Sequence, residues 1–325
     1  MSKSDVVRVA IVQDAPAAFD LNATLEKTEQ RLHDAAERGA SLVVFPEAFL
    51  GGYPKGMTFG VRVGSRSSDG RDWFARYAES AVTRDGAAIQ RVQATVRRCG
   101  VHCVVGLVER SGGTLYCSAA TIGPSGEILS WRRKLMPTAL ERVVWGAGDG
   151  STLSVANSEI GRIGTAICWE NYMPLLRMAL YSQDVQLYCT PTVDDRAVWT
   201  STIQHIALEG RCFVLNACQY AERSDYPSDY PIDESLDNSV ALIRGGSCIV
   251  GPLGDFLVEP IRDRKTTLIA DCDLRQILRG KMDLDVTGHY SRPDIFQLHI
   301  RTEPLNSVVY DAETTRVLQP DEEVQ

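Results

Sequence analysis

Three features are missing from this sequence, and each absence narrows the function. No stretch approaches the roughly 20 consecutive apolar residues of a membrane-spanning helix. There is no long run of Lys and Arg, and 34 basic against 42 acidic side chains give a net charge of −8, which argues against a nucleic-acid or membrane-surface partner. The apolar run near the N-terminus is too short, and too soon interrupted, to be a signal peptide. We therefore expect a cytoplasmic protein.

Cysteine pairs and metal-ligand spacings are also missing. The nine cysteines include no Cys-x-x-Cys pair, and no His or Cys spacing is typical of a metal site. We therefore expect reduced thiols, no disulfides, no metal and no cofactor. All cysteines except Cys168 are interpreted as small buried hydrophobes; these are Cys99, Cys103, Cys117, Cys189, Cys212, Cys218, Cys248 and Cys272.

What is present is an ordinary globular composition with alternating strand and helix patterns. Of the residues, 44% are hydrophobic and 23% charged. A strand at 6–13, a helix from Asp20 to Gly39 and a strand at 41–45 predict parallel neighbours with a right-handed crossover. The order is repeated by a strand at 160–167, a helix at 172–182 and a strand at 185–189. The fold class is therefore α/β.

Further elements follow from the same periodicities. We expect helices at 72–81, 87–98 and 199–209, a strand at 101–107, a hairpin of strands at 114–122 and 127–133, and strands at 212–217, 241–250, 254–259 and 266–271.

Two strand ends carry charged residues. Glu47 follows the second strand, where Pro46 and a Gly-Gly pair turn the backbone out of the sheet, and such rims are where α/β proteins build sites. A rim Glu can equally cap a helix or pair with an Arg. Arg132, Arg133 and Lys134 end another strand. At least one of them faces inward if the strand persists, and a solvated basic edge is the alternative.

Cys168 ends a short apolar run and precedes a polar, aromatic turn and a helical pattern. A thiol between a buried strand and a helix start would face the positive end of the helix dipole, which favours the thiolate. We interpret Cys168 as a catalytic nucleophile.

Three blocks resemble the signature blocks of the nitrilase superfamily, in the order of that family. They are Phe-Pro-Glu-Ala-Phe with Gly-Gly-Tyr-Pro-Lys at 45–55, Arg-Arg-Lys-Leu-Met-Pro-Thr at 132–138 with Glu-Arg-Val-Val-Trp-Gly after it, and Cys-Trp-Glu-Asn-Tyr-Met-Pro at 168–174. Cys168-Trp169-Glu170 resembles the true nitrilase branch. Weaker matches lie at 205–214, 245–247 and 288–293, so that the resemblance covers about residues 6–300.

The resemblance implies a Glu-Lys-Cys triad. Glu47 would be the general base, Lys134 the cation beside the developing negative charge, and Cys168 the nucleophile. Glu141 would hold Lys134 or the substrate. The implied reaction is hydrolysis of a nitrile to the carboxylic acid and ammonia through a covalent thioimidate and thioester. An amidase or carbamoylase, a cyanide- or nitrile-hydrating enzyme, and a non-catalytic binding protein on the same fold are the alternatives.

The same resemblance implies an architecture and an assembly. We expect a four-layer α-β-β-α sandwich forming one domain over residues 1–310, with a polar, mobile tail at 311–325. A homodimer or larger homo-oligomer is implied, including a spiral filament, although the chain ends sooner after the last block than many nitrilases do.

Substrate contacts are predicted only from nearness to the blocks. Aromatic side chains there give an apolar wall for an aryl or alkyl nitrile, although each can equally belong to the core. The predicted pocket residues are Tyr53, Trp169, Glu170, Tyr172, Thr192, Val193 and Trp199.

Overall fold

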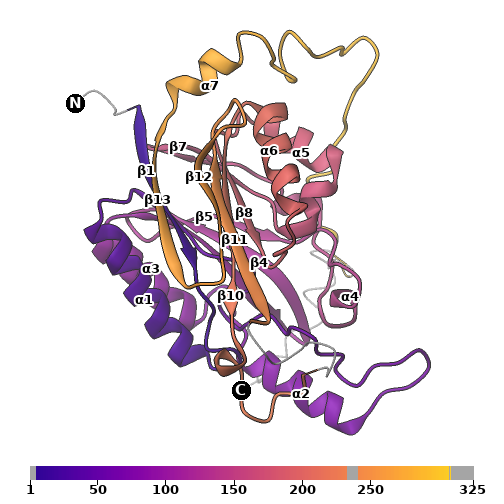
Figure 1. The fold of residues 1–325 in the computed structure, drawn as a ribbon. Coiled ribbons are helices and arrows are strands. Elements are labelled where there is room, and N and C mark those ends of the chain that lie inside the picture. Colours follow the sequence, from indigo (N-terminus) through magenta and orange to yellow (C-terminus); the bar gives the residue numbers. More distant parts are fainter. Residues whose placement is uncertain (1–4, 233–240, 307, 309–325) are drawn as a thin grey trace, which may run out of the picture.

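Two β-sheets lie face to face between two pairs of helices in the computed structural model, which describes residues 5–232, 241–306 and 308 (Figure 1). The first sheet has the strand order β13-β1-β2-β3-β4-β5. Strands β1, β2 and β3 are parallel to one another. Strand β13 is antiparallel to β1, β4 is antiparallel to β3, and β5 is antiparallel to β4. The bounds are β1 (Val6–Gln13), β2 (Leu42–Val44), β3 (His102–Ser111), β4 (Thr114–Ile122), β5 (Ile128–Arg133) and β13 (Thr266–Asp273).

The second sheet has a parallel centre as well. Its order is β10-β11-β9-β8-β7-β6, with β12 paired to β11, and β7, β8 and β9 are parallel. The bounds are β6 (Ala156–Ser158), β7 (Gly161–Thr165), β8 (Leu187–Thr192), β9 (Phe213–Cys218), β10 (Tyr220–Ala221), β11 (Ile243–Val250) and β12 (Phe256–Arg262). Parallel strands buried on both faces explain the near-continuous apolar runs in the sequence.

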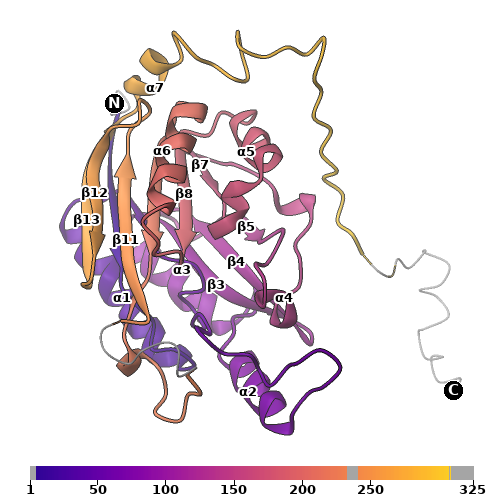
Figure 2. The ribbon, with the colours of Figure 1, turned by 45° about the vertical axis from the view of Figure 1, so that its right-hand side comes forward.

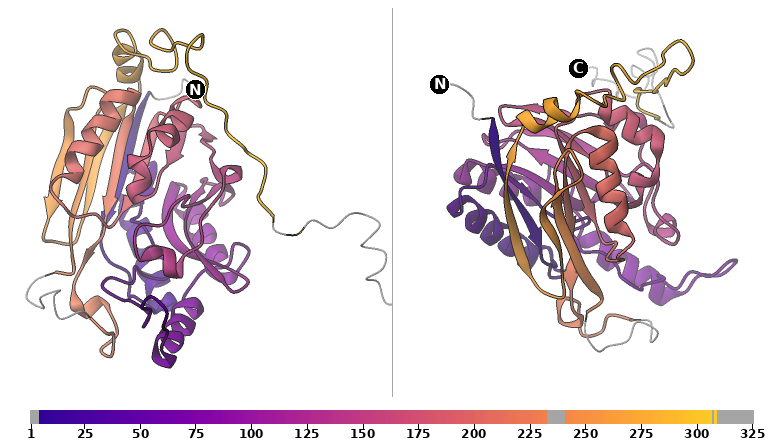
Figure 3. Two further views of the ribbon diagram at one scale, coloured as in Figure 1. Left: turned by 90° about the vertical axis from the view of Figure 1, so that its right-hand side faces the viewer. Right: turned by 45° about the horizontal axis from the view of Figure 1, so that its top comes forward.

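Three apolar cores define four layers. One core fills the space between the sheets and includes Ile11 of β1 and Leu215 of β9. A second lies between the first sheet and helices α1 (Leu21–Glu37) and α3 (Ala87–Cys99). A third lies between the second sheet and helices α5 (Pro174–Tyr181) and α6 (Trp199–Gly210). The predicted α-β-β-α sandwich is thus confirmed, and Figures 1 and 3 show its layers.

The remaining helices lie at the ends of the layers. They are α2 (Ser68–Glu79), α4 (Glu141–Val144) and α7 (Arg275–Gly280), with single 3₁₀ turns at Gly150–Thr152, Cys168–Tyr172 and Arg223–Asp225. No helix in the described part of the chain is both long and apolar enough to cross a bilayer.

The chain after α7 runs as an extended segment away from the sheets (Figure 2). It reaches the 3₁₀ turn at Gly150, where the backbone N–H of Leu305 donates to Asp149 Oδ2 at 2.9 Å. The predicted tail at 311–325 and the domain boundary at residue 310 lie outside the described residues.

Some predicted boundaries are wrong for local reasons. The helix predicted from residue 72 begins at Ser68, because Ser67 caps it by accepting from the Gly70 N–H. The helix predicted at 172–182 begins at Pro174, a residue favoured in the first helical turn. The strand predicted to run to 167 ends at Thr165, three residues before Cys168.

Gly106 on β3 permits the close approach of the segment that carries Glu47. A Cβ at Gly106 would lie 2.1 Å from the carbonyl oxygen of Pro46 and 2.7 Å from Glu47 Cα. Both neighbours are backbone atoms, so they cannot rotate away as a side chain would. Any larger residue at position 106 must displace Glu47.

We therefore expect Gly106→Ala to lower the free energy of unfolding by about 1–3 kcal/mol through overpacking, and to lower kcat/KM by displacing Glu47. Gly113→Ala is the control, since a Cβ there would meet no atom within 4 Å. Denaturant unfolding and steady-state rates measure both effects. Equal behaviour of the two variants would contradict the close-approach argument.

Candidate active site

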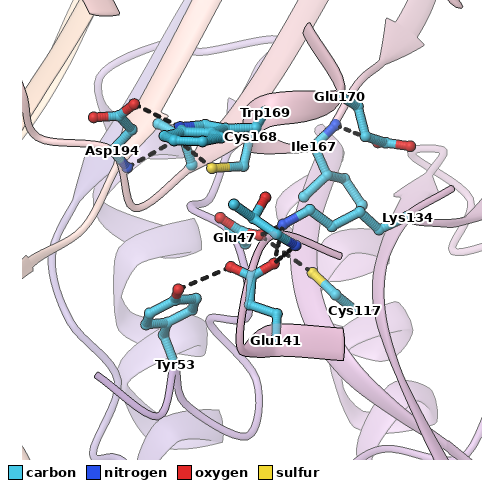
Figure 4. A network of polar contacts seen from close by, with 12 residues as sticks. Glu47, Tyr53, Cys117, Lys134, Glu141, Ile167, Cys168, Trp169, Glu170 and Asp194 are labelled. Atoms are coloured by element: carbon cyan, nitrogen blue, oxygen red, sulfur yellow. Dashed lines mark hydrogen bonds and ion pairs between the residues drawn. The ribbon is translucent and has the colours of Figure 1, made fainter. Parts of the chain in front are cut away.

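Glu47, Lys134 and Cys168 meet at one end of the sandwich (Figure 4). Glu47 follows β2, Lys134 follows β5 and Cys168 follows β7. Strand β5 runs in the direction of β2, because β2 and β3 are parallel and β4 is antiparallel to both β3 and β5. Glu47 and Lys134 therefore come from the first sheet and Cys168 comes from the second. All three lie just beyond the carboxyl end of a strand.

The backbone is strained beside these side chains. Ala48, Ala139 and Cys168 adopt positive φ angles of 48°, 47° and 50°. Non-glycine residues in this region cost on the order of 1–3 kcal/mol each and cluster at functional sites. One of these positions is Cys168 itself, and another directly follows Glu47.

Lys134 is the centre of the polar network. Its ammonium is fully buried and donates to Glu47 Oε1 and to Glu141 Oε2, both at 2.7 Å. Burial is the largest influence and lowers the pKa of Lys134, but the negative charge of Glu47, with a smaller contribution from Glu141, raises it well above its ordinary value. Lys134 therefore stays protonated. Because Arg132 is buried as well, the alternative of a solvated basic edge is excluded.

Glu141 is held by three donors and is poorly placed to move. Besides Lys134, Tyr53 Oη donates to Oε1 at 2.8 Å and the backbone N–H of Thr138 donates to Oε2 at 2.6 Å. Because both of its oxygens already accept hydrogen bonds, the Glu141 carboxylate can orient Lys134 and Tyr53. It also lines the cavity beside Cys168.

Glu47 keeps one oxygen free. Among the described residues, Oε1 accepts from Lys134 and Oε2 has no hydrogen-bond partner although it is buried. Burial, the largest influence, raises the pKa of Glu47; Lys134 opposes this and Glu141 adds to it, and the net shift is upward. A carboxylate with a raised pKa and a free oxygen is suited to take a proton.

Cys168 holds its proton at rest, contrary to the sequence-based expectation that a helix dipole favours the thiolate. Burial and then the negative charge of Glu47 raise the pKa of the Cys168 thiol, and Lys134 only partly opposes them. The helical turn at Cys168–Tyr172 is a single 3₁₀ turn, too short for a sizeable dipole. Thr192 Oγ1 donates to Cys168 Sγ at 3.2 Å, which orients the sulfur. Ionisation therefore needs a base.

Glu170 does not lie in the cavity, so the structure gives it a different place from the predicted substrate contact. Its buried carboxylate accepts from Arg132 at 2.7 Å, from the Leu135 N–H at 2.6 Å and from the Ile167 N–H at 2.8 Å. These contacts tie the strand end that carries Lys134 to the turn that carries Cys168.

A cavity of about 260 Å³ opens beside Cys168. Of the predicted pocket residues, Tyr53, Trp169 and Val193 line it. Thr192 does not line it but donates a hydrogen bond to the sulfur of Cys168. Trp199 is buried and donates to Asn216 Oδ1 at 2.9 Å instead. The complete lining is Tyr53, Lys55, Thr138, Glu141, Cys168, Trp169, Val193, Asp194, Asp195 and Arg196.

Several residues at the site escaped sequence reasoning. Asp194 and Arg196 are two of them, and both contact the predicted pocket residue Trp169: Trp169 Nε1 donates to Asp194 Oδ2 at 2.7 Å, and the Arg196 guanidinium lies 4.8 Å from the Trp169 ring centroid. Gln219 Nε2 donates to the Glu47 carbonyl oxygen at 2.7 Å. Cys117, interpreted only as a core residue, contacts Glu47. The signal in the sequence that could have pointed to Asp194 and Arg196 is the charged run Asp194-Asp195-Arg196, which comes shortly after a strand end.

Within the described ranges, no group of three or more His, Cys, Asp or Glu side chains is arranged to hold a metal ion.

We expect the acidic limb of the kcat/KM profile to report Glu47. The pKa of Glu47 lies above its ordinary value of 4.5, so activity will fall as pH drops through that raised value, because protonated Glu47 cannot accept the Cys168 proton. Rates measured across the acidic range, with stability monitored in parallel, provide the test. A limb at or below 4.5 in the folded protein would contradict this assignment.

Comparison with known proteins identifies the family. The carbon-nitrogen hydrolase family profile matches residues 8–280. The aliphatic nitrilase of Sinorhizobium fredii (strain HH103) is 47% identical over 302 residues, covering 93% of this chain and 98% of that protein. The arylacetonitrilase of Trametes versicolor (strain FP-101664) is 48% identical over 319 residues, covering 94% and 99%.

Solved structures share the fold. The C. elegans NitFhit protein aligns with a TM-score of 0.72 at 18% identity, covering 94% of this chain and 69% of that chain. An amidase from Nesterenkonia sp. aligns with a TM-score of 0.64 at 20% identity, covering 85% and 94%. Taken with the sequence identities, the chain belongs to the carbon-nitrogen hydrolase family, in the nitrilase branch of that superfamily.

Proposed function

We propose that this protein hydrolyses an organic nitrile to the carboxylic acid and ammonia, with Cys168 as nucleophile. The observation that carries the proposal is a buried cluster in which Lys134 pairs with Glu47 and Glu141, while Glu141 and Cys168 line one small cavity. The aliphatic nitrilase and the arylacetonitrilase support the choice of a nitrile.

The first step forms the covalent bond. Cys168 Sγ attacks the nitrile carbon while its proton passes to the free oxygen of Glu47; this proton is then transferred to the nitrile nitrogen, which gives the thioimidate and leaves Glu47 ionised again. Coupling proton transfer to attack fits a thiol whose pKa is raised by burial and by Glu47. Thr192 keeps the sulfur oriented during this step.

Two water molecules complete the reaction. Glu47 removes a proton from the first water, which adds to the thioimidate carbon, and the Lys134 ammonium stabilises the charge that develops in the tetrahedral intermediate. Loss of ammonia leaves a thioester. A second water, activated in the same way, releases the acid and restores the Cys168 thiol.

The first tetrahedral intermediate can also lose the thiol, and this route yields the amide after one water. A bifunctional nitrilase/nitrile hydratase of Lupinus angustifolius, 46% identical and covering 96% of this chain and 90% of that protein, supports amide as a second product. An amidase or carbamoylase would use the same triad. The measured products separate these reactions.

The cavity wall supports an aryl or alkyl nitrile as substrate. Trp169 presents a half-exposed ring, and Tyr53 and Val193 add to the lining. A second pocket of about 430 Å³ shares Tyr53, Lys55, Thr138 and Glu141 with the first, which gives room for a larger substituent.

We also propose a homodimer or larger homo-oligomer, including a spiral filament, and a cytoplasmic location. Large apolar side chains are exposed on and after α7, among them Met282 and Phe296, and a second copy would cover them. All nine cysteines are free, which supports a reducing compartment. Light scattering should give a mass above one chain, and a monomer at micromolar concentration would contradict the assembly.

Replacing the nucleophile tests the function directly. We expect Cys168→Ala to lower ammonia release from aliphatic, aryl and arylaceto nitriles by at least about a thousandfold while the protein stays folded. Cys168→Ser should be nearly as inactive, since a hydroxyl ionises less readily than a thiol. Acid, amide and ammonia are quantified together for each nitrile and its matching amide.

Cys99→Ala is the matched control and should keep its activity, because Cys99 lies on α3, packs against the core between the first sheet and its helices, and does not line the cavity beside Cys168. Turnover of amides but not of nitriles would replace the proposal with an amidase. Sustained ammonia release by Cys168→Ala would remove the nucleophile assignment.

A further inference from the structure

A second thiol contacts the proposed base. Cys117, on β4, is fully buried, and its Sγ lies 3.4 Å from Glu47 Oε1. Its backbone carbonyl oxygen accepts a hydrogen bond from the Lys134 N–H at 2.8 Å. One residue thus touches both the base and the cation of the proposed triad, although it does not line the cavity beside Cys168. Figure 4 shows Cys117 on the side of the Glu47 carboxylate where Lys134 binds.

The two donors act on the same carboxylate oxygen. Oε1 accepts from Lys134 Nζ at 2.7 Å and from Cys117 Sγ at 3.4 Å. Within the described structure, Oε2 accepts nothing. Two donors on one oxygen fix the plane of the carboxylate, because a rotation out of this plane would lengthen both contacts. The free oxygen is therefore presented in one orientation.

We propose that Cys117 is a positioning residue that holds Glu47 so that its free oxygen serves as the base. The proposal rests on the proposed function of Glu47. Cys117 itself forms no bond to substrate and undergoes no redox change. It acts through an S–H group that donates to the ionised form of Glu47.

The surroundings keep Cys117 in the donor form. Burial, and then the negative charge of Glu47, raise the pKa of the Cys117 thiol, so it remains protonated at working pH. Its other neighbours in the same apolar cluster include Leu115, Ala119 and Trp145. A thiol satisfies both demands of this place, a small apolar volume and one weak donor.

The competing explanation is simple packing, and Cys103 offers a matched comparison. Cys103 lies on β3 of the same sheet and is equally buried, but it faces the α1 and α3 side and belongs to the apolar core there. Replacing either cysteine by alanine removes one sulfur from a buried site, so the packing losses should be similar. Only the change at position 117 removes a donor from Glu47.

The test compares Cys117→Ala, Cys117→Ser and Cys103→Ala. Without the donor, the ionised form of Glu47 is less favoured, so the acidic limb of kcat/KM should move to higher pH in Cys117→Ala, with kcat lowered about fivefold or more and KM little changed. Cys117→Ser keeps a hydrogen-bond donor to Glu47, so the acidic limb of kcat/KM should stay at the wild-type pH or move to lower pH. Cys103→Ala should lose stability without moving the limb.

A second readout does not depend on nitrile turnover. The rate at which iodoacetamide alkylates Cys168, followed by mass spectrometry of the Cys168 peptide, also requires proton removal by Glu47. Its acidic limb should move to higher pH in Cys117→Ala and not in Cys103→Ala. If neither limb moves, or if both variants move them equally, Cys117 is only a packing residue. If wild-type protein turns over no nitrile, the proposed function fails while the alkylation profile still decides the role of Cys117.

Discussion

The buried ammonium of Lys134 is the interaction on which the site depends. It is fully inaccessible and lies 2.7 Å from carboxylate oxygens of both Glu47 and Glu141. A buried charge is tolerated only when it is paired and hydrogen-bonded, and removing one partner of such a pair typically costs about 3–5 kcal/mol. The positions of β2, β5 and α4 are therefore linked through one nitrogen atom. The same pairing raises the pKa of Lys134 and keeps it available as a cation.

The site also depends on contacts that join the two sheets. Glu170, in the Cys168 turn, accepts from Arg132 and from the Leu135 N–H, which flank Lys134 in the chain. Gln219 lies directly after β9 of the second sheet and donates to the carbonyl oxygen of Glu47 beyond β2 of the first. These polar ties lie at the end of the apolar core between the sheets. They tie the turn that carries Cys168 to the segments that carry Lys134 and Glu47.

The electrostatics favour a thiol activated during attack over a standing thiolate. Glu47 and Glu141 bring two negative charges against the single positive charge of Lys134, so a third anion on Cys168 is disfavoured in the resting site. A carboxylate whose own pKa is raised becomes a better proton acceptor at the same time. In the proposed mechanism, the thiol therefore loses its proton as the sulfur attacks the substrate carbon.

Much of this protein was determined by the sequence alone. The apolar periods predict β1 at residues 6–13 and β4 at 114–122 with the bounds that the structure has, because buried strands carry an apolar run over their whole length. Glu47, Lys134 and Cys168 were predicted at strand ends, and parallel strands bring such ends to one rim.

Only the tertiary structure decided which side chains distant in the sequence contact one another. Glu170 lies two residues after Cys168 yet binds Arg132, and Cys117 contacts Glu47 from 70 positions away; neither contact leaves a trace in local periodicity. Burial, which sets the charge of the Cys168 thiol, is likewise a property of the packed layers and not of any single segment.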